Sequence, residues 1–193
     1  MKEKKYRIVL GSQSARRQQL LKGLDIDFEI KTLDNAEETF PADMPAGEVA
    51  PYLAGCKAEA LQPLADDELL ITADTVVVVD GKIYGKPSNK EDARSMLQTL
   101  SRRMHEVITG VAITTAERSV VFSVSTKVWF THISTEDIDY YIERYRPFDK
   151  AGSYGIQEWI GFVGIERIEG SFYNVMGLPI HRIYRVLKDF GAI

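Results

Sequence analysis

The sequence predicts an α/β fold in which helices flank a mixed, twisted sheet, and three observations lead to this prediction. A short apolar run at residues 6–10 is followed by a serine-rich turn and an amphipathic segment, which is the strand–turn–helix start of many α/β proteins. A second apolar run at residues 69–73 predicts a buried strand that ends at Asp74. Residues 105–115 and 119–131 surround a polar turn and predict a pair of adjacent strands.

The remaining elements follow from periodicity and from capping or turn residues. Asp80-Gly81 is a two-residue hairpin turn, and residues 88–91 form a capping box at the start of a helix. Pro51 must either kink the helix that contains it or stand at the start of the main part of that helix. Helices are expected at residues 15–24, 47–61, 88–100, 134–146 and 179–190, and further strands at 28–32, 76–79 and 82–84. We therefore predict one domain over residues 1–193, with the hairpin-rich middle forming a second lobe.

Composition excludes several classes of protein. Hydrophobic residues make up 45% and charged residues 27% of the 193 residues, which is typical of a globular chain. The formal net charge of -4 gives no support to a nucleic-acid or membrane-surface partner. Cys56 is the one cysteine, so no intramolecular disulfide is available. The N-terminal apolar run is too short for a signal peptide, and no run is long enough for a membrane helix, so a cytoplasmic location is expected.

The turn at residues 11–17 is the first segment that indicates chemistry. Unpaired N–H groups at a helix N-terminus favour an anion, whereas Arg16 and Arg17 in the first turn oppose the helix dipole. A bound phosphate chain resolves this conflict, because guanidinium groups grip phosphate through paired hydrogen bonds. The segment is not a Walker A loop. The alternative is that both arginines are simply solvated.

Acidic and basic side chains elsewhere suggest a metal-assisted reaction on phosphate. Asp74, at the end of an apolar strand, can bind a metal or accept a proton from water. Glu37 and Glu38 lie in a polar loop, and hard cations such as Mg²⁺ prefer carboxylates. Lys57 and Lys86 can bind phosphate as compact positive charges. Taken singly, the aspartate could equally be a turn residue, and each lysine could be an ordinary surface residue.

The glycine-rich segment at residues 149–157 ends in Gln157, whose amide can pair with the edge of a base. The alternative is an ordinary glycine-rich loop. His105, His132 and His181 are too scattered for a metal site and are expected to be structural or surface residues.

Taken together, these segments resemble the Maf family of nucleoside triphosphate pyrophosphatases. They occur in the order found in that family and span nearly the whole chain. The matching stretches are residues 10–17, 20–21, 57–58, 73–77, 85–87, 100–111, 149–157 and 174–179. Three features depart from the usual pattern of the family: Gly11 replaces alanine, Ala15 replaces proline, and Glu158-Trp159 follows Gln157 where a glycine is common.

The resemblance implies a Maf/ITPase-like fold with two lobes around a deep cleft, often as a homodimer. It implies that Asp74 is the catalytic acidic residue and, with the loop residue Glu38, a ligand of Mg²⁺ or Mn²⁺. Glu37, next to Glu38, is the alternative ligand. The residues expected around the phosphates and the metal are Ser12, Arg17, Lys57 and Lys86.

Base preference also follows from the resemblance. Arg16, Thr75 and Gln157 match the subfamily that prefers dTTP and UTP. The sister subfamily, which takes a methylated guanine nucleotide, differs at these positions. The expected reaction is hydrolysis of these nucleotides, or of modified uridine triphosphates, to the monophosphate and pyrophosphate, which would clear surplus nucleotides from the pool. The alternatives are a non-catalytic regulator of cell division and an inosine-type purine triphosphate pyrophosphatase.

Overall fold

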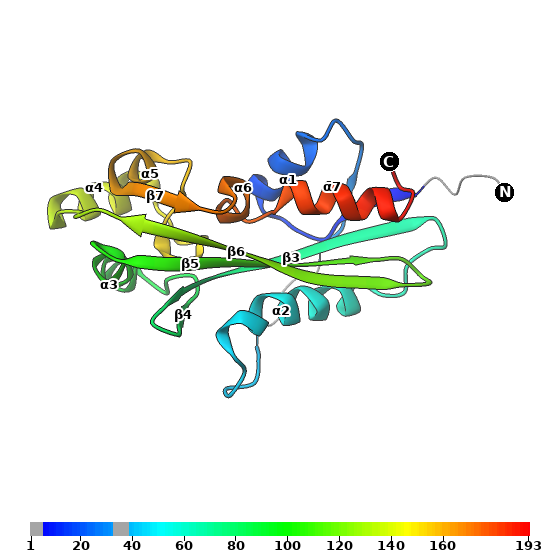
Figure 1. Ribbon diagram of the computed structural model, residues 1–193, viewed down its shortest axis with the longest axis horizontal. Coiled ribbons are helices and arrows are strands. Elements are labelled where there is room, and N and C mark those ends of the chain that lie inside the picture. The colour runs from blue at the N-terminus through cyan, green and yellow to red at the C-terminus, as the bar shows by residue number, and fades with distance from the viewer. Residues whose placement is uncertain (1–5, 33–38) are drawn as a thin grey trace. The chain divides into compact units, whose positions relative to one another are not determined.

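The computed structural model describes residues 6–32 and 39–193. Within these residues, seven strands form one mixed sheet in the order β2-β1-β3-β5-β6-β7, and β4 pairs with β3 (Figure 1). The strands are β1 (Arg7–Leu10), β2 (Glu29–Ile30), β3 (Glu68–Val79), β4 (Lys82–Tyr84), β5 (Met104–Thr114), β6 (Ser119–Phe130) and β7 (Ile165–Glu169). The predicted mixed sheet is confirmed.

Helices flank this sheet, as predicted. They are α1 (Ala15–Lys22), α2 (Ala46–Ala60), α3 (Lys90–Leu100), α4 (Thr135–Tyr145), α5 (Trp159–Gly164), α6 (Phe172–Val175) and α7 (Ile180–Asp189), with a 3₁₀ turn, η1, at Ala151–Ser153. The described chain divides into two compact units. Unit 1 contains residues 6–32, 39–74, 109–124 and 177–193, and unit 2 contains residues 75–108 and 125–176. No helix within 6–32 or 39–193 is both long and apolar enough to cross a membrane.

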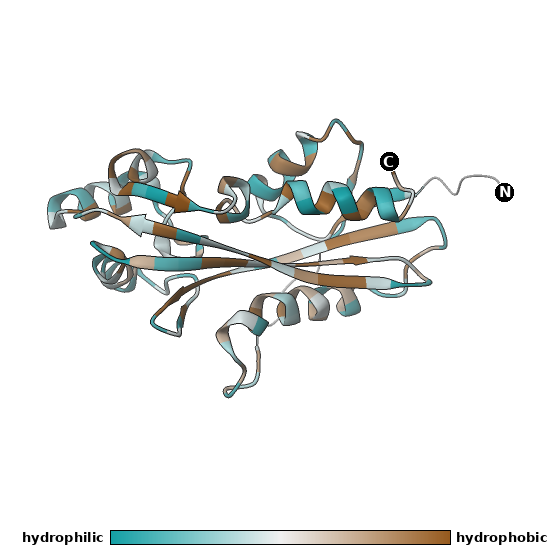
Figure 2. Ribbon diagram, in the orientation of Figure 1, coloured by the Kyte–Doolittle hydropathy of each residue, from teal (hydrophilic) through white to brown (hydrophobic). Residues whose placement is uncertain are grey.

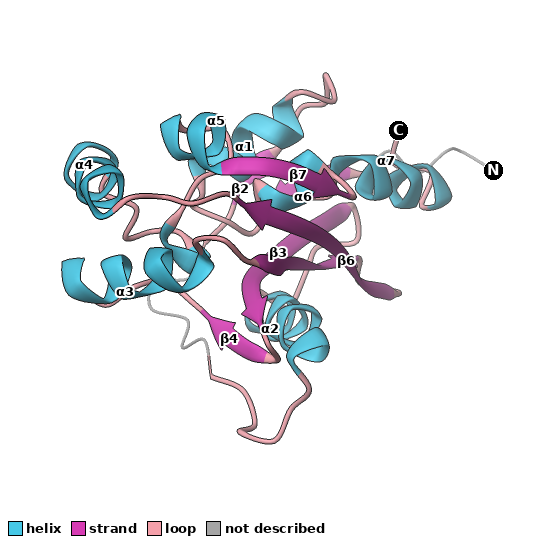
Figure 3. Cartoon of the chain, turned by 60° about the vertical axis from the view of Figure 1, so that its left-hand side comes forward, coloured by secondary structure: helices cyan, strands magenta, loops and turns pink. Residues whose placement is uncertain are grey.

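In unit 1, β1 lies between two parallel neighbours. Its last residue, Leu10, pairs with Ile30 of β2 and Ile71 of β3. Helix α2 covers one face of these strands, and α1 and α7 cover the other (Figures 1 and 3). Burial on both faces explains why residues 69–71, near the start of β3, form a continuous apolar run instead of an alternating one. Gly110 of β5 allows α2 to approach closely, because a Cβ there would lie 2.2 Å from the carbonyl carbon of Ala50.

Helix α7 buries one apolar face. Bands of hydrophilic and hydrophobic residues alternate along α7 (Figure 2), and its buried residues are Ile183, Val186 and Leu187. Helix α2 begins at Ala46, and Pro51 lies inside the helix. The helix continues through Pro51 to Ala60.

The prediction that a strand ends at Asp74 is wrong, because β3 continues to Val79. Its first part pairs with β1 in parallel as far as Ile71, and its last part pairs with β4 in antiparallel, with Val79 opposite Lys82. Sheet neighbours and the β-branched residues after Thr75 therefore keep the chain extended through the polar pair. The predicted hairpin turn is confirmed, since Asp80 and Gly81 have φ of 48° and 77°.

Two helix starts in unit 2 were predicted from capping residues. Ser134 caps α4, and its hydroxyl accepts a hydrogen bond from the backbone N–H of Asp137 at 3.1 Å. The cap of α3 is Asn89 instead of Ser88, and its Oδ1 accepts from the N–H of Asp92 at 2.9 Å. Asparagine is as good an N-cap as serine, so the pattern alone could not separate the two positions. The short elements β7, α5 and α6 were not predicted.

His105 belongs to the core of unit 2, so the expectation of a structural histidine is confirmed. The ring is 1% exposed, and its Nε2 lies 2.7 Å from the hydroxyl of Tyr154. Its ring also makes edge contacts with those of Phe130 and Tyr154, at centroid distances of 5.0 and 5.4 Å. Burial lowers the pKa of His105 to about 3, so the side chain is neutral at physiological pH.

We expect His105 to make the protein less stable as the pH falls. Its pKa is lower in the folded chain than the ordinary value of 6.5, so below that value the unfolded chain takes up the proton first. The preferential protonation of the unfolded chain lowers the free energy of unfolding by about 2–3 kcal/mol between about pH 6.5 and about pH 4.5. Urea unfolding should therefore show a weaker pH dependence for His105→Gln than for the wild type. His132→Gln is the control, because His132 is exposed. Equal pH slopes for the wild type and His105→Gln would contradict the prediction.

Candidate active site

The turn between β1 and α1 is built from its own short polar side chains. The Oγ of Ser12 accepts a hydrogen bond from the N–H of Ser14 at 3.3 Å, and Ser14 caps α1 by accepting from the N–H of Arg17. Gly11 has little room for a side chain, because a Cβ would lie 2.7 Å from the Cγ2 of Thr72. The helix begins at Ala15, so it forms without the proline expected there.

Arg17 reaches from α1 to two distant backbone carbonyls in unit 1. Its Nε donates to the oxygen of Gly177, and its Nη1 donates to the oxygen of Ala73, each at 2.8 Å. The second bond fixes the residue directly before Asp74. Arg17 therefore positions the strand that carries the predicted catalytic residue, a role that the sequence did not indicate. Its neighbour Arg16 is half-buried in the same first turn of the helix.

Lys57 and Asp74 form an ion pair between α2 and β3. The Nζ of Lys57 lies 2.5 Å from the Oδ1 of Asp74, and the side chains are only 18% and 10% exposed. One turn earlier on α2, the oxygen of Ala54 accepts a hydrogen bond from the Oγ1 of Thr72 at 2.7 Å. The hydrogen bond between Thr72 and Ala54 holds α2 against β3, so it keeps Lys57 and Asp74 in place relative to one another. The structure thus brings Arg17, Lys57 and Asp74 together.

Of the residues predicted to bind a metal ion, Asp74 is the one within the described ranges. Within the described ranges, no three or more histidine, cysteine, aspartate or glutamate side chains gather into a metal site. Magnesium is commonly held by one or two carboxylates together with phosphate oxygens of the substrate, and Asp74 is suited to supply one such carboxylate. Glu38, the predicted second ligand, and its alternative Glu37 lie outside the described residues.

Thr75, Lys86 and Gln157 belong to unit 2. The segment that carries Lys86 contacts the glycine-rich segment, because the N–H of Gly152 donates to the oxygen of Gly85 at 3.0 Å. Gly152 has φ of 66°, and a Cβ there would lie 2.8 Å from Val77, so no larger residue fits. Lys86 itself is exposed.

Gln157 presents an acceptor that is not used within the described chain. Its Oε1 is buried, and none of the described residues donates a hydrogen bond to it. A buried acceptor without a partner costs about 1–3 kcal/mol, so a ligand that donates to this oxygen would gain affinity. This property fits the predicted role of Gln157 in recognising a base.

Comparison with known proteins identifies the family. The family model described as Maf-like protein matches residues 7–190. The chain belongs to the Maf family.

Relatives in this family match the chain over almost its full length. A dTTP/UTP pyrophosphatase of Porphyromonas gingivalis is 59% identical over 97% of this chain and 96% of its own length. Proteins of the same name from Parabacteroides distasonis and Flavobacterium johnsoniae are 53% and 48% identical, covering 97% and 96% of this chain and 97% and 96% of their own lengths. The structure of a HAM1 protein from Coxiella burnetii covers 95% of this chain and 99% of its own, with a TM-score of 0.50 and 16% identity. That likeness concerns the fold alone.

Two contacts near the Maf motif that ends at Gln157 could not be predicted from the sequence. Glu158, which departs from the usual pattern of the family, accepts a hydrogen bond from the hydroxyl of Tyr141 and forms an ion pair with Lys150. No local signal could have revealed this, because Tyr141 lies on α4, 17 residues away along the chain.

Proposed function

We propose that this protein hydrolyses dTTP and UTP between the α- and β-phosphates, releasing the nucleoside monophosphate and pyrophosphate. The observation that carries the proposal is the ion pair between Lys57 of α2 and Asp74 of β3, the strand that Arg17 anchors. The pair sets a carboxylate and a cationic donor beside one another, as phosphoryl transfer requires. The names of the Maf relatives, at 48–59% identity, support the same reaction.

In the proposed reaction, Asp74 acts on water. The carboxylate accepts a proton as the water oxygen bonds to the α-phosphorus, and the bond from that phosphorus to the pyrophosphate oxygen breaks. Lys57 and Lys86 stabilise the charge that develops on pyrophosphate, and Arg17 holds the backbone before Asp74 in place. A Mg²⁺ or Mn²⁺ ion bound by Asp74 and Glu38 would neutralise charge on the phosphate oxygens. Ser12, in the turn before α1, would lie beside the phosphates.

The proposed preference for a pyrimidine rests on Gln157, with Arg16 and Thr75 as further specificity residues. Uracil and thymine offer an N3–H donor flanked by two carbonyl acceptors, and the buried Oε1 of Gln157 can accept from that donor. Cytosine has an acceptor at N3, so a glutamine oxygen held opposite that position would face a lone pair instead of a donor. Sites built on such hydrogen bonds discriminate strongly, whereas the extra methyl of thymine is worth only about 1–3 kcal/mol. The biological role that follows is removal of surplus or modified pyrimidine nucleotides.

A panel of triphosphates tests both the reaction and the base preference. Pyrophosphate release should be fast with dTTP and UTP and slow with CTP, GTP and ITP. Gln157→Glu should reduce the preference for UTP over CTP by about tenfold or more, because the carboxylate keeps an acceptor but loses the amide donor. Gln98→Glu, the same change at an exposed position on α3, is the control.

Each outcome of the panel separates the alternatives. Comparable wild-type rates with CTP would contradict the base preference and leave the pyrophosphatase activity standing. Faster release from ITP would indicate a purine enzyme. No release from any triphosphate would contradict the proposed reaction and favour a non-catalytic role.

A further inference from the structure

Gln157 occupies the middle of a tight turn whose two ends are tied together. The N–H of Glu158 donates to the oxygen of Gly155 at 3.0 Å, so Ile156 and Gln157 are the central residues of the turn. The direction of the Gln157 side chain therefore depends on how Gly155 and Glu158 are held.

One hydroxyl holds both ends of this turn. The hydroxyl of Tyr141 accepts a hydrogen bond from the N–H of Gly155 at 3.0 Å and donates to the Oε2 of Glu158. Tyr141 lies on α4 and is fully buried (0% exposed), so it belongs to the hydrophobic core of unit 2. Burial, reinforced by the hydrogen bond to Glu158, raises the pKa of Tyr141, which keeps its hydroxyl protonated as a donor.

The carboxylate of Glu158 is fixed from its other side by Lys150. The Nζ of Lys150 lies 3.1 Å from the Oε1 of Glu158 and 2.8 Å from the Oδ1 of Asp149, and the lysine is only 7% exposed. A Cβ at residue 155 would lie 2.8 Å from the Cδ of Glu158, so any residue larger than glycine would displace the carboxylate. The carboxylate thus packs directly on the backbone of the turn.

We propose that Tyr141 and Glu158, together with Lys150, form a positioning network that orients Gln157 and so determines which base the enzyme accepts. The inference rests on the proposed function and adds to it residues that do not themselves contact the base. Tyr141 and Glu158 are positioning residues, because they act through the turn. A hydrogen bond to a base discriminates only when its acceptor is held in one place, since a mobile amide can adapt to a second base.

The first test measures the ratio of kcat/KM for UTP to that for CTP. Tyr141→Phe preserves the volume of the side chain and removes both hydroxyl contacts, and Glu158→Gln removes the charge. Each should lower the ratio by about tenfold, which corresponds to about 1.4 kcal/mol. Glu143→Gln on the same helix, in an exposed ion pair with Lys90, should leave the ratio unchanged. If Tyr141→Phe does not give folded protein, Glu158→Gln carries the test.

A double variant separates positioning from a general loss of stability. In a Gln157→Ala background, adding Tyr141→Phe should cause no further change in the UTP to CTP ratio, because the group that Tyr141 orients is gone. A purely structural role would lower the activities with UTP and CTP equally in both backgrounds. Amide hydrogen exchange provides a readout that does not need nucleotide: Tyr141→Phe should accelerate exchange at Gly155.

The possible results are distinguishable. Unchanged exchange at Gly155, or an unchanged UTP to CTP ratio in the single variants of an enzyme that discriminates, would overturn the inference alone. A wild-type enzyme that hydrolyses UTP and CTP equally would overturn the proposed base preference, and the inference with it.

Discussion

Replacing Asp74 with asparagine is expected to lower the rate of pyrophosphate release from dTTP by about 10²–10⁴-fold. The amide cannot accept the proton of the attacking water, and it is a weaker ligand for a hard cation than a carboxylate. Asparagine has nearly the same shape as aspartate, and its oxygen can still accept a hydrogen bond from Lys57. We therefore expect the variant to fold, and thermal unfolding should be measured beside kcat at saturating Mg²⁺.

Asp80→Asn is the matched control for this experiment. Asp80 lies in the turn after β3, and its side chain is 82% exposed in an ion pair with Arg103. Asparagine tolerates the positive φ of this residue, so the same chemical change should leave the rate unaltered. If Asp74→Asn kept a rate near that of the wild type, the catalytic role of Asp74 would be wrong.

Replacing Lys57 with methionine is expected to lower the free energy of unfolding by roughly 2–4 kcal/mol. Removing one partner of a buried ion pair leaves the other charge without compensation, which costs about 3–5 kcal/mol when the pair is fully buried. The side chains of Lys57 and Asp74 are 18% and 10% exposed, so the expected cost lies somewhat lower. Urea denaturation measures the change directly.

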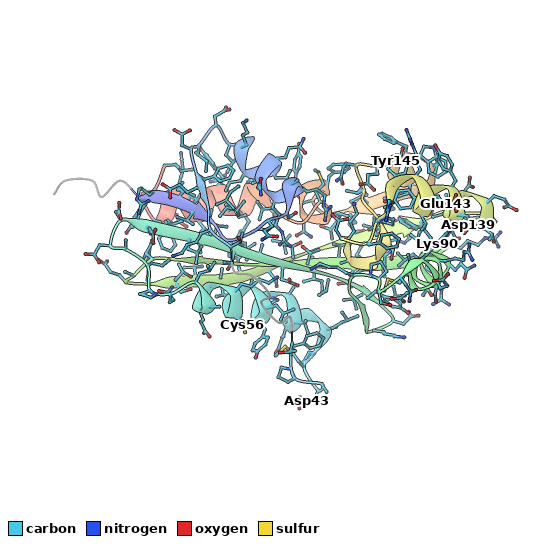
Figure 4. All side chains as sticks on the ribbon, turned by 180° about the vertical axis from the view of Figure 1, so that it is seen from behind. Asp43, Cys56, Lys90, Asp139, Glu143 and Tyr145 are labelled. Carbon is cyan, nitrogen blue, oxygen red and sulfur yellow. The ribbon has the colours of Figure 1, made fainter. Side chains whose placement is uncertain are left out.

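A double-mutant cycle isolates the contribution of the pair itself. Adding Asp74→Asn to Lys57→Met removes the isolated buried carboxylate and should restore most of the lost stability. Lys90→Met is the control, because Lys90 of α3 and Glu143 of α4 form an exposed pair, at 41% and 68% exposure (Figure 4). That change should alter stability by no more than about 0.5 kcal/mol. Additive effects in the cycle would contradict the coupling of Lys57 and Asp74.

Local patterns were sufficient to predict most of the elements. Apolar runs predicted β1 and the start of β3, Asp80-Gly81 predicted the hairpin, and Ser134 predicted the start of α4. Each of these signals depends on residues close together in the chain, because turns and caps are formed by neighbouring backbone groups. The continuation of β3 through Asp74 was missed, since it depends on pairing with β1 before Asp74 and with β4 after it.

The sequence by itself identified which side chains are suited to phosphate chemistry, because charge and hydrogen-bonding capacity belong to the residue type. It also placed Asp74 and Gln157 in motifs that resemble the Maf family. Only the tertiary structure decided which groups meet. Arg17 contacts Gly177 across 160 residues, and Lys57 pairs with Asp74 across 17. Such contacts depend on the order of the strands in the sheet and on which helix packs against which strand. Neither of these produces a periodic pattern in the sequence.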